Sequence, residues 1–216
     1  MVDLKTTDNG IFLYVYMALH ASINGWKHCI PIIVVDGTFL KSKFGGTLLS
    51  ATTQDALGKI FPLAFAIVDF ENDASWEWFF VQVKKTFGVK EKLSIISDRH
   101  ESIISAVKEV YPEAAHAFCI FHIINNLKTK FKRNTLQIKE LFLAAAKSYK
   151  IEDFDTNMSE IRKIDERVHQ YLQDIGLDKW IKVHSTNNIF RMMTSNIAES
   201  LNFAIKMHGT SNHNFT

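Results

Sequence analysis

The chain contains few of the residues that break or cross-link a polypeptide: two Cys, three Pro and nine Gly among 216 residues. Cys29 and Cys119 provide no disulfide framework and favour a reducing compartment. The scarcity of Pro and Gly excludes long linkers and low-complexity segments. No apolar run approaches membrane-spanning length, and Asp3 and Asp8 stand where a signal peptide carries basic residues. These absences predict a soluble, intracellular protein of one domain, or one domain with an insertion.

The overall charge is small, but the basic residues are unevenly distributed. A formal net charge of +2 does not by itself predict nucleic-acid binding. Residues 125–139 nevertheless carry five basic side chains and no acidic one, whereas acidic residues are frequent beyond Lys150. A charged run is usually a solvated helix face, but Lys128, Lys132 and Arg133 are also candidates for contacts with DNA phosphates.

Hydrophobic periodicity predicts an α/β fold with a mixed sheet. Three apolar runs joined by short turns indicate an antiparallel meander, and alternating helices and strands follow it. Trp76 and Phe87 belong to a helix with helical apolar spacing, for which Asp73 or Ser75 is the expected N-cap. The expected elements in chain order are a helix at 9–22, strands at 30–36, 47–53 and 60–68, a helix from 75 to 87, a strand at 93–97, a helix at 101–110, a strand at 114–119, and helices at 121–132, 136–149, 154–175, 179–184 and from 196 onward.

This order predicts a helical lead-in over residues 1–29 and a core over 30–127, in which helices cover the faces of the sheet. A helical insertion then spans residues 128–193. The final segment, 194–216, is expected to return to the core as a helix.

Two aspartates stand at the ends of predicted strands. Asp36 follows the apolar run Ile30–Val35, and Asp98 follows Leu93–Ser97. Ligands gather at the carboxyl ends of strands in such sheets, and a carboxylate there needs a cation or hydrogen bonds to offset its desolvation. Either aspartate alone is often just a turn residue. Together with Glu199 on a later helix, however, they could hold Mg²⁺ for phosphoryl transfer.

The chain resembles the core of the Mutator-like element (MULE) transposases. The resemblance lies in VVDGTFLKSKFGG, in LLSATTQDALGKIFPLAFAIVDFENDASWEWFF, in SIISDRHESIISAVKEVYPEAAHAFCIFHIINNLK and in TSNIAESLN. It extends from about Asp36 to Leu127 and resumes near Thr194.

The resemblance implies an RNase H-like fold with an Asp-Asp-Glu (DDE) triad, in which a helical insertion precedes the glutamate. Asp36, Asp98 and Glu199 match the three acids, which are both the catalytic residues and the ligands of Mg²⁺ or Mn²⁺. The implied reaction is cleavage of DNA at transposon ends, followed by strand transfer into target DNA. A homodimer and a nuclear location are implied with it.

The same resemblance assigns Cys119 and His122 to a Cys-x-x-His signature that supports the active site. Such a pair is weak evidence for zinc, because a structural zinc site needs four ligands. We therefore do not expect zinc, although His116, His100, His169 or His184 could supply further ligands.

Two alternatives compete with a transposase. The far-red impaired response group of plant transcriptional regulators has a similar core and implies a non-catalytic, DNA-associated protein. An RNase H-like nuclease acting on RNA–DNA hybrids shares the metal chemistry, but it fits the helical insertion and the NIAESLN segment poorly. The zinc modules that flank the transposase core in the family are not found in these residues, so a truncated copy is also expected.

Overall fold

The computed structural model describes residues 1–41 and 45–180 of the chain, which form two compact units. The sheet unit contains residues 1–115, and the helical unit contains the described residues from 116 to 180. No helix within these described ranges is long and apolar enough to cross a membrane.

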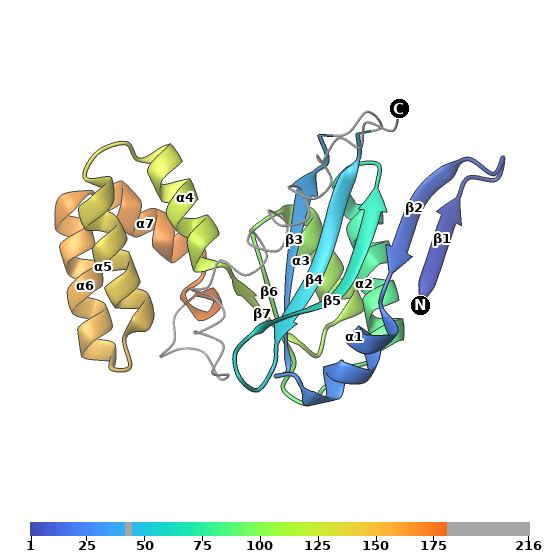
Figure 1. The fold of residues 1–216 in the computed structure, drawn as a ribbon. Coiled ribbons are helices and arrows are strands. Elements are labelled where there is room, and N and C mark those ends of the chain that lie inside the picture. The colour runs from blue at the N-terminus through green and yellow to red at the C-terminus, as the bar shows by residue number, and fades with distance from the viewer. Residues whose placement is uncertain (42–44, 181–216) are drawn as a thin grey trace, which may run out of the picture. The chain divides into compact units, whose positions relative to one another are not determined.

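A seven-stranded mixed sheet organises the first unit (Figure 1). Its strand order is β1-β2-β5-β4-β3-β6-β7. Strands β3, β4 and β5 form an antiparallel meander, whereas β6 lies parallel to β3. The strands are β1 (Val2–Thr6), β2 (Phe12–Met17), β3 (Ile32–Phe39), β4 (Thr47–Gln54), β5 (Ile60–Val68), β6 (Ser94–Ser97) and β7 (Ala115–Phe118).

Helices α2 (Asp73–Phe87) and α3 (Glu101–Val110) pack against the sheet through an aromatic core. Trp76, Phe79 and Phe80 of α2 are fully buried and contact one another edge-on or tilted. The helix begins with a capping box in which the Asn72 side chain accepts a hydrogen bond from the Ser75 backbone N–H. The N-cap is therefore Asn72, one residue before the first expected candidate.

This arrangement is an RNase H-like fold, because a three-stranded meander is followed by a helix, a strand parallel to the first meander strand, and a second helix. The fold class expected from the sequence is confirmed. The meander strands lie close to their expected positions, since runs of β-branched residues bounded by turns specify buried strands.

The prediction of a helix over residues 9–22 was wrong. Residues 2–17 form an antiparallel hairpin of β1 and β2, and β2 continues the sheet by pairing with β5. Tyr14 and Tyr16 are buried against α2, whereas Met17 on the opposite face is exposed, as the alternation of a strand requires. The short helix α1 (His20–Gly25) and a 3-10 turn (Trp26–His28) then lead to β3.

The second unit is a set of packed helices. Phe142 is fully buried, and its ring centroid lies 4.9 Å from that of Trp180. One helix was expected over residues 154–175, but two helices meet at Asp165, whose side chain accepts a hydrogen bond from the Arg167 N–H and so starts the second helix. The helices are α4 (Ile120–Lys130), α5 (Thr135–Lys147), α6 (Ile151–Ile164) and α7 (Glu166–Asp174), and a 3-10 turn follows at Leu177–Lys179.

The boundary between the units differs from the expected one. Contacts divide the chain after Ala115, so α4 groups with the helices rather than with the core, which we had extended to residue 127. Three expected features lie mostly or wholly outside the described residues. They are the helix expected at 179–184, the end of the insertion at 193 and the helix that carries Glu199.

Candidate active site

Strands β3 and β6 bring Asp36 and Asp98 to the same level of the sheet. The parallel register pairs Ile32 with Ser94 and Val34 with Ile96. Each aspartate stands two residues beyond that last pair. Because neighbouring strands lie about 4.8 Å apart, the two residues are adjacent at the carboxyl end of β6. Two acids that are distant in the sequence thus meet at one site.

Asp36 differs from its expected position at a strand end. Strand β3 continues to Phe39, and Asp36 pairs with Ser50 of β4, whose hydroxyl donates to the Asp36 main-chain oxygen at 3.3 Å. The residue is only 8% exposed, whereas Asp98 is intermediate in exposure. The pairing of Asp36 with β4 fixes the direction of its side chain, which a turn would not do.

Asp98 also has a local structural role. Its Oδ1 accepts a hydrogen bond of 3.0 Å from the backbone N–H of His100, which is the N-cap residue of α3. This contact orients the carboxylate at the start of the helix, where the helix dipole favours a negative charge.

Glu71 is a third acidic residue at this site, and it was not among the expected ones. It lies between β5 and α2. A Cβ added to Gly37 would overlap its carboxylate, meeting Oε2 at 2.9 Å. Burial and, next, the negative charge of Asp98 raise the pKa of Glu71, while His100 lowers it. Its only signal in the sequence is an acid in the turn after the meander, together with a glycine directly after Asp36.

The donor set suits a hard divalent cation. Asp36 and Asp98 provide carboxylate oxygens, and Mg²⁺ is commonly held by one or two carboxylates while it keeps several waters. Within residues 1–41 and 45–180, no group of three or more His, Cys, Asp or Glu side chains is close enough to hold a metal ion. The described residues therefore fit a two-carboxylate site, and Glu199, the expected third acid, lies outside them.

Cys119 and His122 lie at the start of α4. Cys119 is the buried N-cap residue, and His122 stands in the first turn, so the two residues are three apart and share one side of the helix. His116 in β7 is a third member of this segment, and burial and the charge of Lys179 lower its pKa to about 4. The described residues contain no cluster of ligands for zinc here.

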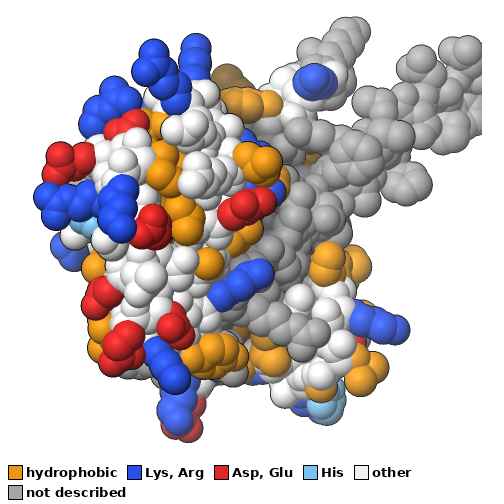
Figure 2. All heavy atoms as spheres, turned by 90° about the vertical axis from the view of Figure 1, so that its left-hand side faces the viewer, with side chains coloured by type: hydrophobic (Ala, Val, Ile, Leu, Met, Phe, Trp, Pro, Cys, Tyr) orange, Lys and Arg blue, Asp and Glu red, His pale blue; other side chains and the backbone are white. Residues whose placement is uncertain are grey.

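The expected DNA-contacting residues stand around the turn between α4 and α5. Lys128, Lys132 and Arg133 are exposed, and none of them takes part in an ion pair within the described part of the chain. This turn lies at the top of the helical unit in Figure 1, and Lys and Arg side chains gather at the top of the face shown in Figure 2.

The basic residues of α6 and α7 behave differently. Arg162 binds Glu166 at 2.9 Å, and Lys163 binds Glu160 at 2.6 Å. Arg167 binds Asp165 through two nitrogens. These pairs neutralise their part of the surface, whereas Lys128, Lys132 and Arg133 lie together at the α4–α5 turn without an ion pair in the described part of the chain.

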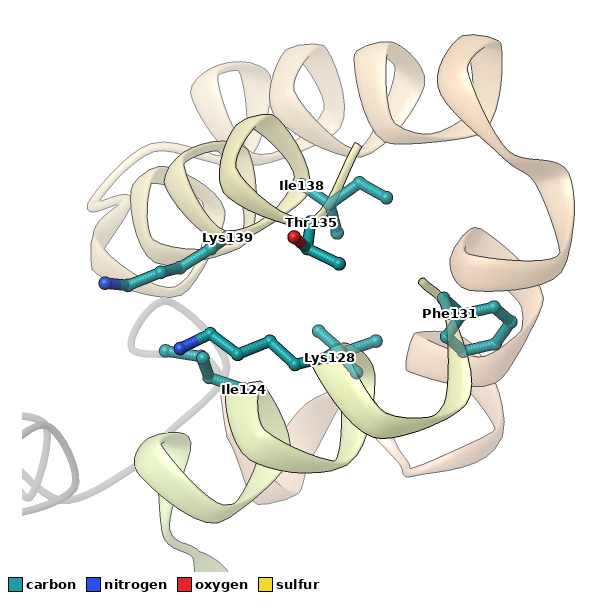
Figure 3. Close-up of a pocket in the computed structure, with 7 residues that line it drawn as sticks. Ile124, Lys128, Phe131, Thr135, Ile138 and Lys139 are labelled. Atoms are coloured by element: carbon teal, nitrogen blue, oxygen red, sulfur yellow. The ribbon is translucent and has the colours of Figure 1, made fainter. Parts of the chain in front are cut away.

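A small cavity between α4 and α5 helps to define this surface. Its volume is about 10 Å³, which is roughly the room that one water molecule needs. Ile124, Phe131 and Ile138 line it together with Thr135, and the aliphatic chains of Lys128 and Lys139 extend along its rim toward the same side (Figure 3). Packing between the two helices therefore places one lysine from each of them on a common surface.

The order and direction of the strands define the class: an RNase H-like domain. Residues 32–126 match the family model of the MULE transposase domain. This match confirms the resemblance expected from the sequence, and it contains both Asp36 and Asp98.

Individual proteins show the same relationship. The chain is 24% identical over 187 residues to Protein FAR1-RELATED SEQUENCE 5 from Arabidopsis thaliana. The aligned segment covers 83% of this chain and 24% of that protein. It is 25% identical over 195 residues to the transposase for insertion sequence element IS905 from Lactococcus lactis. This aligned segment covers 81% of this chain and 47% of that transposase. The chain thus spans less than half of either relative.

Among solved structures, the HTLV-2 integrase catalytic core domain in complex with magnesium aligns with a TM-score of 0.31 and 16% identity, covering 56% of this chain and 88% of that chain. The fold assignment rests on the order and direction of the strands rather than on this alignment.

Proposed function

We propose that the chain is the catalytic domain of a Mutator-like DDE DNA transposase, which cleaves DNA strands at transposon ends and transfers them to target DNA. The observation that carries this proposal is the parallel register of β3 and β6, whose last pair lies two residues before Asp36 and Asp98, inside the segment that matches the MULE transposase domain. Nearby carboxylates at the end of a buried sheet repel one another unless a cation is bound.

In this proposal Asp36 and Asp98 hold Mg²⁺ or Mn²⁺, and Glu199 completes the set. The metal supplies activation of the attacking oxygen and stabilisation of the leaving oxygen in an in-line displacement. The protein supplies two carboxylates whose directions are fixed by the sheet ladder and by the α3 N-terminus. Cys119 and His122 keep the supporting role that the resemblance to the family implies for them.

DNA is the proposed partner, and the unpaired basic residues of the α4–α5 turn are its proposed phosphate contacts. Lys128, Lys132 and Arg133 neutralise backbone phosphates and so position the duplex without selecting its sequence. Pairing of two DNA ends by a homodimer and a nuclear location belong to the same proposal.

The similarity to FAR1-RELATED SEQUENCE 5 supports a second candidate, a non-catalytic DNA-associated regulatory protein derived from a transposase. Such a protein needs the DNA surface but no metal site. The two candidates therefore differ in their response to Mg²⁺.

The test is metal-dependent stabilisation of purified protein, combined with nicking of supercoiled plasmid. For a site that exists only in the folded state, Mg²⁺ at ten times its Kd adds about 1.4 kcal/mol and raises Tm by several degrees. Asp36→Asn is expected to abolish this rise and to reduce nicking by about 10³-fold or more, since the metal contributes several kcal/mol to the barrier.

Asp73→Asn is the matched control, because it removes an exposed aspartate at the start of α2. It should leave both the Tm rise and the nicking unchanged. A wild-type chain whose Tm does not respond to millimolar Mg²⁺ or Mn²⁺ would reject the transposase and favour the regulatory protein.

A further inference from the structure

Glu71 approaches the main chain of β3 at Gly37, the residue after Asp36. Gly37, the residue after Asp36, has no side chain, and the Glu71 carboxylate occupies the space that a Cβ would fill. Both carboxylate oxygens lie within contact of that position. The absence of a side chain at residue 37 therefore admits this carboxylate beside β3.

Two charged or polar residues and one buried tryptophan surround the Glu71 carboxylate. Asp98 and His100 act on its carboxylate electrostatically from the β6–α3 connection. Trp76 is fully buried, and among the described residues its indole N–H has no hydrogen-bond partner, although it lies close enough to Glu71 to favour the charged carboxylate. The carboxylate thus lies at the main chain of the residue after Asp36, within electrostatic reach of Asp98 and close to the Trp76 N–H.

Glu71 does not stand where a direct metal ligand would. No three acidic or histidine side chains in the described ranges are close enough to share one ion. Mg²⁺, however, keeps several of its waters in proteins, and carboxylates that accept hydrogen bonds from such waters tune the affinity of the site. A carboxylate beside Gly37 and within electrostatic reach of Asp98 suits that outer position.

We propose that Glu71 is a positioning residue of the Asp36–Asp98 site, whose carboxylate accepts hydrogen bonds from water bound to the divalent metal ion. This inference rests on the proposed metal-dependent function. It assigns a role to the turn between β5 and α2, and it explains why residue 37 lacks a side chain.

The first test is metal affinity, measured by calorimetry with Mn²⁺ and by the Tm rise with Mg²⁺. Glu71→Gln keeps the size of the side chain, and we expect it to weaken binding by about 10–100-fold, as is typical of outer-sphere partners. Without metal, the same variant should melt at the wild-type temperature or above it, because it removes a buried charge that Asp98 repels. A purely structural role would lower the metal-free Tm instead.

Two further variants serve as matched controls. Glu77→Gln makes the same chemical change at an exposed position of α2, and it should bind metal as the wild type does. Glu71→Asp keeps a carboxylate one methylene shorter, and its affinity should lie closer to the wild type than that of Glu71→Gln.

The second test uses the contact with Gly37. Gly37→Ala places a methyl group where the carboxylate lies, so it should displace Glu71 and weaken metal binding to a similar extent. In a Glu71→Ala background there is no carboxylate to displace, and Gly37→Ala should cause no further loss. Such non-additivity is the signature of two residues that act through one contact.

The outcomes separate this inference from the proposed function. If wild-type protein binds Mn²⁺, Asp36→Asn does not, and Glu71→Gln binds as tightly as the wild type, the role of Glu71 is overturned while the two-aspartate site stands. If wild-type protein binds no divalent metal, the proposed function fails and the role of Glu71 fails with it.

Discussion

The sheet unit and the helical unit hold their charged residues in different environments. In the sheet unit, Asp36 is nearly buried in the ladder beside Asp98. Two of its lysines bind main-chain carbonyls: Lys90 donates to the Trp26 and Cys29 carbonyls at 2.6 and 2.7 Å, and Lys84 donates to the Val110 carbonyl at 2.6 Å. In the helical unit, the charged groups lie on the surface, either in pairs along α6 and α7 or unpaired at the α4–α5 turn.

This difference shows how each architecture serves one part of the proposed chemistry. A strand inside a sheet fixes the direction of a side chain, which a metal site requires. Exposed helix ends keep cations hydrated and adaptable, which suits contacts with a phosphate backbone. Surface ion pairs contribute at most about 1 kcal/mol each to stability. The main effect of the pairs in α6 and α7 is therefore that they neutralise the basic side chains of these helices.

The largest expected effect tests whether the units are energetically separate. Phe142→Ala removes a fully buried ring that contacts Trp180 and should cost the helical unit about 3–5 kcal/mol. Amide hydrogen exchange should then accelerate in α4–α7 but not in β3–β6, and the Tm response to Mg²⁺ should persist. Leu136→Ala, an exposed position on the same helix, should change stability by less than about 0.5 kcal/mol. Loss of protection in both units together would show that they unfold as one.

Acid should weaken the helical unit through His116. Its pKa is about 4 in the folded state, against 6.5 for the free side chain. As the pH falls from 6.5 to 4, the unfolded chain binds a proton that the folded chain does not, so stability declines over this window by about 3 kcal/mol.

His116→Asn should remove this part of the pH dependence, measured as the difference in unfolding free energy between pH 7 and pH 4. The exposed His28→Asn serves as control and should keep the wild-type slope. Equal slopes for wild type and His116→Asn would contradict the assignment.

The smallest expected effect is on DNA affinity, and it tests the unpaired basic residues of the α4–α5 turn. Replacing Lys128, Lys132 and Arg133 by Gln should reduce DNA affinity about fivefold per residue near 0.15 M salt, and should lower the slope of log K against log salt by about 0.9 for each. Fluorescence anisotropy with a labelled duplex measures both quantities.

The matched control is the triple Gln variant of Arg162, Lys163 and Arg167, which removes the same charge from side chains that are already paired. It should change the slope far less. Equal losses in the two triple variants would show that only net charge matters and that the α4–α5 turn has no special role.

Much of the sheet could be predicted because its strands have strong local signals. The apolar runs before Asp36 and Asp98 are bounded by turn residues, and this placed both acids at one end of a sheet. The N-terminal hairpin could not be predicted in the same way. Phe12, Val15 and Tyr16 fit helical spacing, but the segment forms a strand because β5 supplies the hydrogen-bonding partner.

The site was only partly predictable for a related reason. Asp36 and Asp98 each follow a recognisable strand, whereas Glu71 stands in a turn with no periodic pattern. Its relation to Gly37 depends on how α2 packs on the sheet, which no local signal encodes.

The sequence alone determined the strands from β3 to β7, the helices α2 and α3, the aspartates that follow or lie in those strands, and the uneven placement of basic residues. These features depend on neighbouring residues, through side-chain periodicity and turn chemistry. Only the tertiary structure decided that β6 lies beside β3 in register, that Glu71 reaches the main chain at Gly37, and that the cations of α6 and α7 are paired while those of the α4–α5 turn are not. Each of these depends on contacts that form only when distant segments of the chain pack together.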